Sequence, residues 1–149
     1  MNIQLTGIAT EETDSILRMM NAFCVLDGYA FDEVLRRKNI SRLITNQELG
    51  RLWVIRLDGI PIGYVALTFG FSFEFRGRDA FVDELYLDEA HRGKGIGGTV
   101  LDLILKQAPA IGVEAIHLEV EKHNERGKRL YLKKGFYDHN RFLMTKFVE

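Results

Sequence analysis

The chain has 149 residues, of which 46% are hydrophobic, and a net charge of −1 at pH 7. This length and composition exclude an extended disordered chain, and we expect a single domain over residues 1–149. The balanced charge argues against a nucleic-acid partner, and no apolar run approaches the ~18–20 residues that a membrane span needs.

The single cysteine and the first residues bear on where the protein works. Cys24 has no second cysteine to pair with, which is typical of a reducing compartment. We expect it to be a small buried hydrophobe. Residues 1–10 lack the basic-then-apolar pattern of a secretion signal. The sequence therefore predicts a cytoplasmic protein that does not act at a membrane.

The first half of the chain predicts a strand, two helices and a hairpin. Residues 2–8 alternate as in a short strand, and residues 10–26 and 31–44 place apolar side chains at helical spacing. Residues 51–69 alternate on both sides of Asp58-Gly59, a dipeptide typical of a hairpin turn.

The pattern of the second half is different. Residues 79–87 and 115–120 are typical of strands, and a helix is predicted between them over residues 96–112. A further helix is predicted over residues 124–135, and a final strand over residues 141–148. Antiparallel strands followed by a strand–helix–strand unit predict a mixed α/β sheet. Its right-handed crossover would join residues 82–87 to residues 116–120.

A cluster of glycines lies between a predicted strand and a predicted helix, in the sequence HRGKGIGG that begins at His91. Glycine in an ordered segment costs about 0.5–1 kcal/mol relative to alanine, so the cluster needs a physical reason. The start of a helix presents unpaired N–H groups, and glycines allow a phosphate to approach them. Arg92 and Lys94 add positive charge there. We therefore predict a phosphate-binding loop.

Two other phosphate-binding patterns are alternatives for this glycine cluster. The nucleoside triphosphate loop needs Lys-Ser or Lys-Thr after its glycines, and neither follows here. Gly93, Gly95 and Gly98 do match the dinucleotide fingerprint, with Glu119 about 20 residues on. However, five residues separate the strand from the first glycine, whereas the dinucleotide turn follows its strand directly. A dinucleotide-dependent oxidoreductase is therefore the less favoured alternative.

The glycine loop and a second motif together resemble the GNAT superfamily of N-acetyltransferases. Arg92, Gly95 and Gly97 occupy the positions of its acyl-CoA loop, R/Q-x-x-G-x-G/A, which follows an acidic strand. The second motif, N-x-x-A-x-x-L-Y-x-K-x-G-F, is similar to this chain at Asn124, Leu130, Tyr131, Lys133, Gly135 and Phe136, and Gly127 replaces its alanine. The resemblance covers roughly residues 50–149.

The resemblance implies the GNAT-type acyl-CoA N-acyltransferase fold, in which antiparallel strands and helices precede strand–loop–helix–strand–helix. It also implies direct transfer of an acetyl group from acetyl-CoA, the co-substrate, to a primary amine. A backbone N–H near residues 85–87 would donate a hydrogen bond to the oxyanion that develops during the transfer. It would lie beside a bulge that admits the pantetheine arm. The residues implied to contact acetyl-CoA are Leu85, Tyr86, Leu87, Arg92, Gly93, Lys94, Gly95, Ile96, Gly97, Gly98, Asn124 and Lys133.

Three residues are candidates for the chemistry. An amine with a pKa near 10.4 must lose a proton before it can attack, so a base is required. Asp83 and Glu84 are adjacent on the strand before the loop, and alternation would place them on opposite faces. Glu84 is the preferred base, with Asp83 close behind, and a base at this position is implied by the resemblance. The resemblance also implies that Tyr131 is the acid for the departing thiolate.

The acceptor amine belongs to a small molecule or a protein. The stretch from Gly63 to Leu87 loosely resembles the polyamine-acetylating branch of the family, so a polyamine-like acceptor is one expectation. A non-catalytic acyl-CoA-binding sensor is the alternative function. The four histidines lack metal-ligand spacing, so no metal is predicted. Alternating phenylalanines over residues 69–75 are compatible with a homodimer.

Overall fold

A computed structural model describes residues 1–149, which divide into two compact units, residues 1–119 and residues 120–149. The strands of the first unit are β1 (Ile3–Gly7), β2 (Gly50–Leu57), β3 (Ile60–Ser72), β4 (Gly77–Leu87) and β5 (Ala115–His117). Its helices are α1 (Thr13–Asp27), α2 (Glu33–Thr45) and α3 (Ile96–Gln107), with short 3₁₀ turns η1 (Thr10–Glu12), η2 (Glu89–His91) and η3 (Ala108–Ile111). The second unit contains α4 (Glu125–Lys133).

The five strands form one mixed sheet in the order β1-β2-β3-β4-β5. Neighbouring strands from β1 to β4 are antiparallel to one another, and β5 is parallel to β4. Asp58 and Gly59 join β2 to β3 with φ angles of 50° and 85°, the left-handed conformation that a tight hairpin turn requires. The predicted hairpin and mixed α/β sheet are therefore confirmed.

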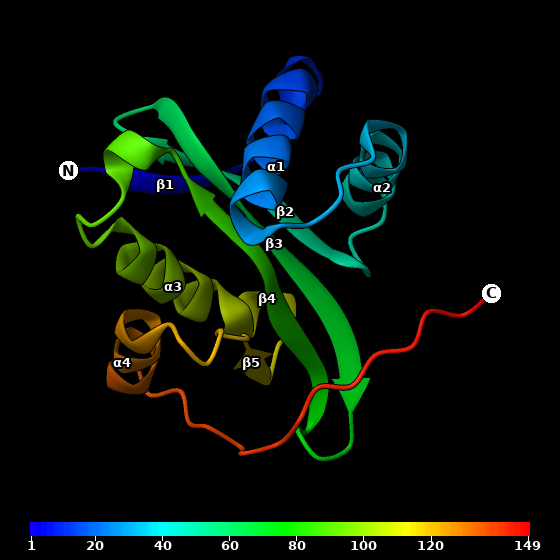
Figure 1. Ribbon diagram of the computed structural model, residues 1–149, viewed down its shortest axis with the longest axis vertical. Coiled ribbons are helices and arrows are strands. Elements are labelled where there is room, and N and C mark those ends of the chain that lie inside the picture. The colour runs from blue at the N-terminus through cyan, green and yellow to red at the C-terminus, as the bar shows by residue number, and fades with distance from the viewer. The chain divides into compact units, whose positions relative to one another are not determined.

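Helices cover both faces of this sheet (Figure 1). On one face, α1 and α2 place Ile16, Met20 and Ile40 against the sheet. On the other face, α3 buries Val100 and Ile104 completely. Each such aliphatic side chain contributes about 1.5–3 kcal/mol when it leaves water, so the two layers hold the sheet between them. No helix is both long enough and apolar enough to cross a membrane.

Local signals set the ends of several helices. Asp32 caps α2 by accepting a hydrogen bond from the backbone N–H of Leu35 at 3.1 Å. Gly112 closes η3 after α3, with a φ angle of 72°, and Gly135 follows α4 with a φ angle of 93°. Both glycines adopt the left-handed conformation that ends a helix. Cys24 is buried, as expected.

Two strand predictions were wrong. The strand predicted over residues 115–120 ends at His117, and it pairs with Asp79–Phe81 rather than with residues 82–87. Residues 141–148 form no strand. The second unit contains no strand, so residues 141–148 have no partner strand within that unit to satisfy their backbone groups. Residues 118–120 thus form no strand although β4 continues beyond Phe81, whereas residues 141–148 have no partner strand within their unit.

Gly63 allows β3 and β4 to approach closely. A Cβ atom at this position would lie 2.0 Å from the carbonyl oxygen of Tyr86, a backbone atom that cannot rotate away. We therefore expect Gly63→Ala to lower the free energy of unfolding by about 3 kcal/mol, measured by urea denaturation. The control is Gly7→Ala, because a Cβ at Gly7 meets no atom within 4 Å. Equal stability of the two variants would contradict this account.

Candidate functional site

Asp83 and Glu84 lie at a β-bulge of β4. On β3, Ala66 pairs with Glu84 and the next residue, Leu67, pairs with Val82, so Asp83 is an extra residue on its strand. A bulge interrupts the alternation of side chains between the two faces of a sheet. Both carboxylates therefore line one pocket, and the expectation that they face opposite sides was wrong.

This pocket, hereafter the α2 pocket, has a volume of about 470 Å³. It lies on the face of the sheet that α1 and α2 cover, and aliphatic side chains form much of its wall. A volume between about 300 and 1,000 Å³ is typical of sites for small molecules. Its lining residues are Met20, Arg36, Asn39, Ile40, Arg42, Leu43, Leu49, Leu52, Ala66, Thr68, Asp83 and Glu84.

Glu84 is held by two neighbours. Arg36 of α2 donates from one guanidinium nitrogen to both carboxylate oxygens, at 2.8 and 2.9 Å. The hydroxyl of Tyr64 on β3 donates to the same carboxylate at 2.8 Å. Burial, with the negative charge of Glu84, raises the pKa of Tyr64, so the hydroxyl keeps its proton. Only 13% of the Glu84 side chain is exposed, and its carboxylate serves as an acceptor in this network.

Asp83 is in a different electrostatic state. Burial, and next to it the charge of Glu84, raises the pKa of the Asp83 carboxyl above its usual range, although Arg36 opposes this shift. No side-chain hydrogen bond or ion pair holds Asp83. A carboxyl with a raised pKa binds a proton more strongly than an aspartate side chain in water does. Asp83 is therefore the carboxylate in the α2 pocket that is available to accept one.

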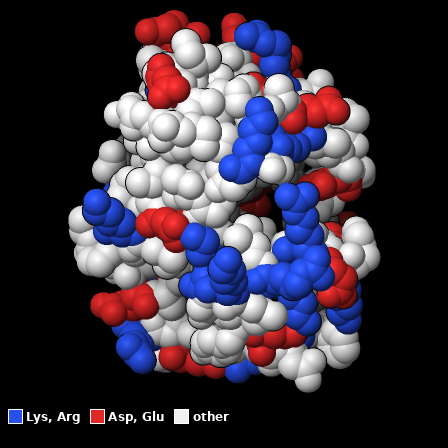
Figure 2. All heavy atoms as spheres, turned by 90° about the vertical axis from the view of Figure 1, so that its left-hand side faces the viewer, with Lys and Arg blue, Asp and Glu red and all other residues white.

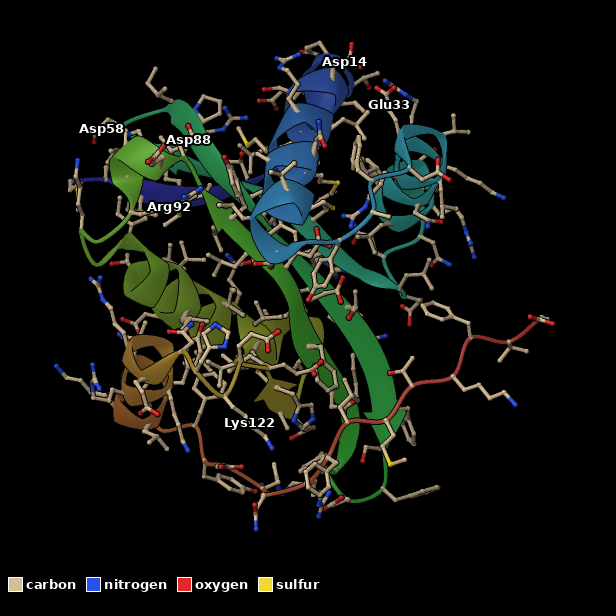
Figure 3. All side chains as sticks on the ribbon, in the orientation of Figure 1. Asp14, Glu33, Asp58, Asp88, Arg92 and Lys122 are labelled. Atoms are coloured by element: carbon tan, nitrogen blue, oxygen red, sulfur yellow. The ribbon has the colours of Figure 1, made fainter.

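Arg92 fastens the loop that follows β4. Its Nε donates to the carbonyl oxygen of Leu87 at 2.8 Å, and its guanidinium carbon lies 5.3 Å from the centre of the Tyr86 ring. Figure 3 labels Asp88 and Arg92 in the segment that joins β4 to α3. These contacts fold the loop back onto the end of the strand, so Arg92 has a structural task besides its positive charge.

The glycine loop leads into the start of α3. Gly93 and Gly95 have φ angles of 74° and 81°, and Gly95 is the residue that immediately precedes the helix. The first N–H groups of α3 have no partner within the helix. A Cβ at either Gly95 or Gly97 would meet no atom within 4 Å, so space is open in front of these groups. Lys94 is exposed between the glycines.

The predicted contact residues of the first unit divide into two kinds. Tyr86 and Leu87 on β4, and Ile96 on α3, place their side chains in the core, so they can offer a ligand only backbone groups. Leu85 and Gly98 are partly or fully buried. Gly93, Lys94 and Gly95 are exposed. Figure 2 shows the side of the molecule toward which this loop lies in Figure 1, and residues of both charge signs are interspersed there.

Three predicted site residues belong to the second unit. Asn124 caps α4 by accepting a hydrogen bond from the N–H of Gly127 at 2.9 Å. A Cβ at Gly127 would lie 2.7 Å from the side-chain nitrogen of Asn124, so glycine at this position accommodates the cap. Tyr131 contacts the ring of Phe136, and burial raises the pKa of its hydroxyl. Lys133 is exposed on the last turn of α4.

Sequence reasoning missed three residues of the α2 pocket and its network: Arg36, Arg42 and Tyr64. Two signals were available. Arg36 shares the helix face of Ile40 and Leu43 by its spacing, which places a cation on the face turned toward the sheet. Tyr64 occupies a buried strand position, where its hydroxyl needs a partner. No local signal marked Arg42.

Comparison with known proteins identifies the family of this chain. The sequence profile of the acetyltransferase (GNAT) family matches residues 16–136. The chain is 26% identical over 123 residues to an uncharacterised N-acetyltransferase of Archaeoglobus fulgidus, covering 81% of this chain and 84% of that protein. It is 39% identical over 70 residues to YwnH of Bacillus subtilis, a putative phosphinothricin acetyltransferase. That match spans 44% of this chain and less than half, 43%, of YwnH.

Solved structures share the fold. An integron cassette protein from a salt-marsh metagenome superimposes with a TM-score of 0.82 at 26% identity, covering 99% of this chain and 90% of that one. A predicted acetyltransferase of Clostridium acetobutylicum, solved with acetyl-CoA, has a TM-score of 0.78 at 18% identity over 97% of this chain and 96% of its own. With the family profile matched over most of its length, this chain belongs to the GNAT family of N-acetyltransferases.

Proposed function

We propose that this protein transfers the acetyl group of acetyl-CoA directly to a primary amine of a small molecule or protein, with residues 1–149 acting as one domain. One observation carries the proposal. The strand that places Asp83 and Glu84 in the α2 pocket is followed, after the short turn η2, by the glycine loop at the start of α3. A single strand therefore connects a pocket suited to an amine with a loop suited to a phosphate.

The loop supports acetyl-CoA as the co-substrate. The unpaired N–H groups at the start of α3, the open space before Gly95 and Gly97, and the charge of Lys94 suit a pyrophosphate. The edge of β4 beyond Phe81 has no β5 neighbour, so backbone groups of residues 85–87 are available to a ligand there. We propose that Asn124 and Lys133 add contacts to the pantetheine arm and a phosphate.

Asp83 is the proposed base, in place of the preferred sequence candidate, Glu84. Glu84 already accepts hydrogen bonds from Arg36 and Tyr64, whereas Asp83 is unpaired and has a raised pKa. Asp83 would take the proton of the ammonium group, which leaves a lone pair on the amine nitrogen. We assign Glu84 the task of keeping Arg36 in place beside the pocket.

Acetyl-CoA supplies an acetyl group on a thioester. The amine nitrogen bonds to the carbonyl carbon and loses its second proton to solvent, the carbon–sulfur bond breaks, and the sulfur leaves with the bonding electrons. Tyr131 is the proposed donor of a proton to that sulfur. Burial raises the pKa of its hydroxyl, so the hydroxyl holds its proton at neutral pH until the sulfur becomes negative. A cytoplasmic location and a homodimer stay predictions.

Calorimetric titration tests the donor first. We expect micromolar binding of acetyl-CoA and no binding of NADH by the full chain. Amine-dependent release of free thiol then tests the transfer. Binding without release for any amine would favour the alternative, a non-catalytic acyl-CoA sensor. Binding of NADH instead would revive the oxidoreductase alternative and contradict the proposal.

A further inference from the structure

The charges that line the α2 pocket are balanced rather than acidic. Arg36 and Glu84 form a close ion pair, with a distance of 2.8 Å between nitrogen and oxygen, so they offset one another. Two charged side chains remain, Asp83 and Arg42, and neither takes part in a hydrogen bond or ion pair. The pocket therefore offers a ligand one free carboxylate and one free guanidinium.

The positions of the neighbouring residues on α2 indicate that the two free charges are at different ends of the pocket. Arg36 is bonded to Glu84, the residue next to Asp83, and thus marks the acidic end. Arg42 lies six residues further along α2, which is about 9 Å along the helix axis at 1.5 Å per residue. Ile40 lies between these two points on the helix, and Leu43 of the same helix and Leu52 of β2 also line the pocket. Apolar side chains thus line the pocket around the free anion and the free cation.

From this arrangement we propose that the acceptor is a small zwitterion. It carries a primary amine at one end, an anionic group such as a carboxylate at the other, and an apolar spacer of several methylene groups between them. The amine would lie at Asp83 and the anionic group at Arg42. The pocket volume of about 470 Å³ suits a molecule of this size rather than a folded protein surface. The inference rests on the acetyl transfer proposed above.

A polyamine is the contrasting acceptor. Its second amine would approach the guanidinium of Arg42, and two like charges repel one another at that end of the pocket. An alkylamine, whose far end is uncharged, would bury its spacer but leave Arg42 unpaired. The three acceptor types therefore differ only in the charge at one end, which makes them a matched set of probes.

The experiment compares 6-aminohexanoate, hexylamine and 1,6-diaminohexane as acceptors. We expect kcat/KM for acetyl-CoA-dependent thiol release to be about tenfold higher for 6-aminohexanoate than for hexylamine, and lowest for the diamine. Arg42→Gln is expected to reduce the value for 6-aminohexanoate to that for hexylamine. Arg42→Glu is expected to make the diamine the best of the three, because the charge that it meets is then reversed.

Lys38→Gln is the control, since it removes a positive charge from α2 at a residue that does not line the pocket. This variant should keep the full preference for 6-aminohexanoate. Equal or better use of the diamine by the unmodified protein would overturn the zwitterion inference while the acetyl transfer stands. If none of the three amines supports thiol release, the zwitterion inference is overturned, and the titration with acetyl-CoA decides whether the donor assignment falls with it.

Discussion

Replacing Gly97 by aspartate is expected to weaken acetyl-CoA binding by about 100-fold or more without loss of folding stability. Gly97 is the second residue of α3, has no unusual backbone conformation, and has open space where a Cβ would lie. A carboxylate there would occupy the region proposed for the pyrophosphate. Like charges about 4 Å apart repel by about 4 kcal/mol near a protein surface, and partial screening leaves a large effect.

The folding stability of the Gly97→Asp variant is expected to increase. A negative charge in the first turn of a helix contributes about 0.3–1 kcal/mol, and replacing glycine within a helix contributes a similar amount. Titration calorimetry would measure the affinity for acetyl-CoA, and thermal unfolding without ligand would measure the stability. Gly97→Ala is the matched control, because it adds a methyl group without charge and should retain much of the affinity. Unchanged affinity in Gly97→Asp would overturn the assignment of this loop.

Asp83→Asn is expected to lower turnover by about 10²–10⁴-fold, the usual contribution of a positioned base. The change keeps the shape of the side chain and removes its ability to take a proton. Because the Asp83 side chain has no hydrogen-bond partner, the substitution removes no hydrogen bond from the folded protein. The affinity for acetyl-CoA should stay within a few-fold, since the proposed phosphate contacts lie beyond β4. Steady-state kinetics and calorimetry would separate the two effects.

The pH dependence distinguishes Asp83 further. Its pKa is raised in the folded protein, so the base loses activity as the pH falls through that raised value, above the usual range near 3.9. The sign for stability is opposite: the charged form is disfavoured by folding, so stability falls as the pH rises from the unfolded value near 3.9 to the raised folded pKa, and the full loss is present above that pKa. Asp83→Asn should therefore lack this acidic limb in kcat/KM and be at least as stable as the unmodified protein at pH 7.

Glu84→Gln is the comparison for this second experiment. Glu84 accepts from Arg36 and Tyr64, so its replacement leaves the Arg36 cation without its partner. We expect this variant to lose about 1–3 kcal/mol of stability, as for a hydrogen bond to a charged group. If Glu84→Gln abolishes turnover at full stability while Asp83→Asn remains active, then Glu84 is the base and the assignment made here is wrong.

The sequence by itself determined the features that arise within a few residues. Asp58-Gly59 favours a tight turn, Asp32 caps a helix, and Gly112 and Gly135 end helical segments, because each acts on its own backbone. The order of strands and helices followed from side-chain periodicity. The glycine loop and the Asn124 motif were also local patterns, so the family could be inferred from them.

Only the tertiary structure decided what joins distant residues. Arg36 and Glu84 are 48 residues apart, and Tyr64 is 20 residues from Glu84, so no window of sequence contains their contact. The bulge at Asp83 depends on the register between β3 and β4, which brings two carboxylates into one pocket. The predicted strand over residues 141–148 shows the same limit, because alternation indicates a strand only where a neighbouring strand can satisfy its backbone. Side-chain pattern acts locally, whereas pairing, burial and charge balance are properties of the assembled fold.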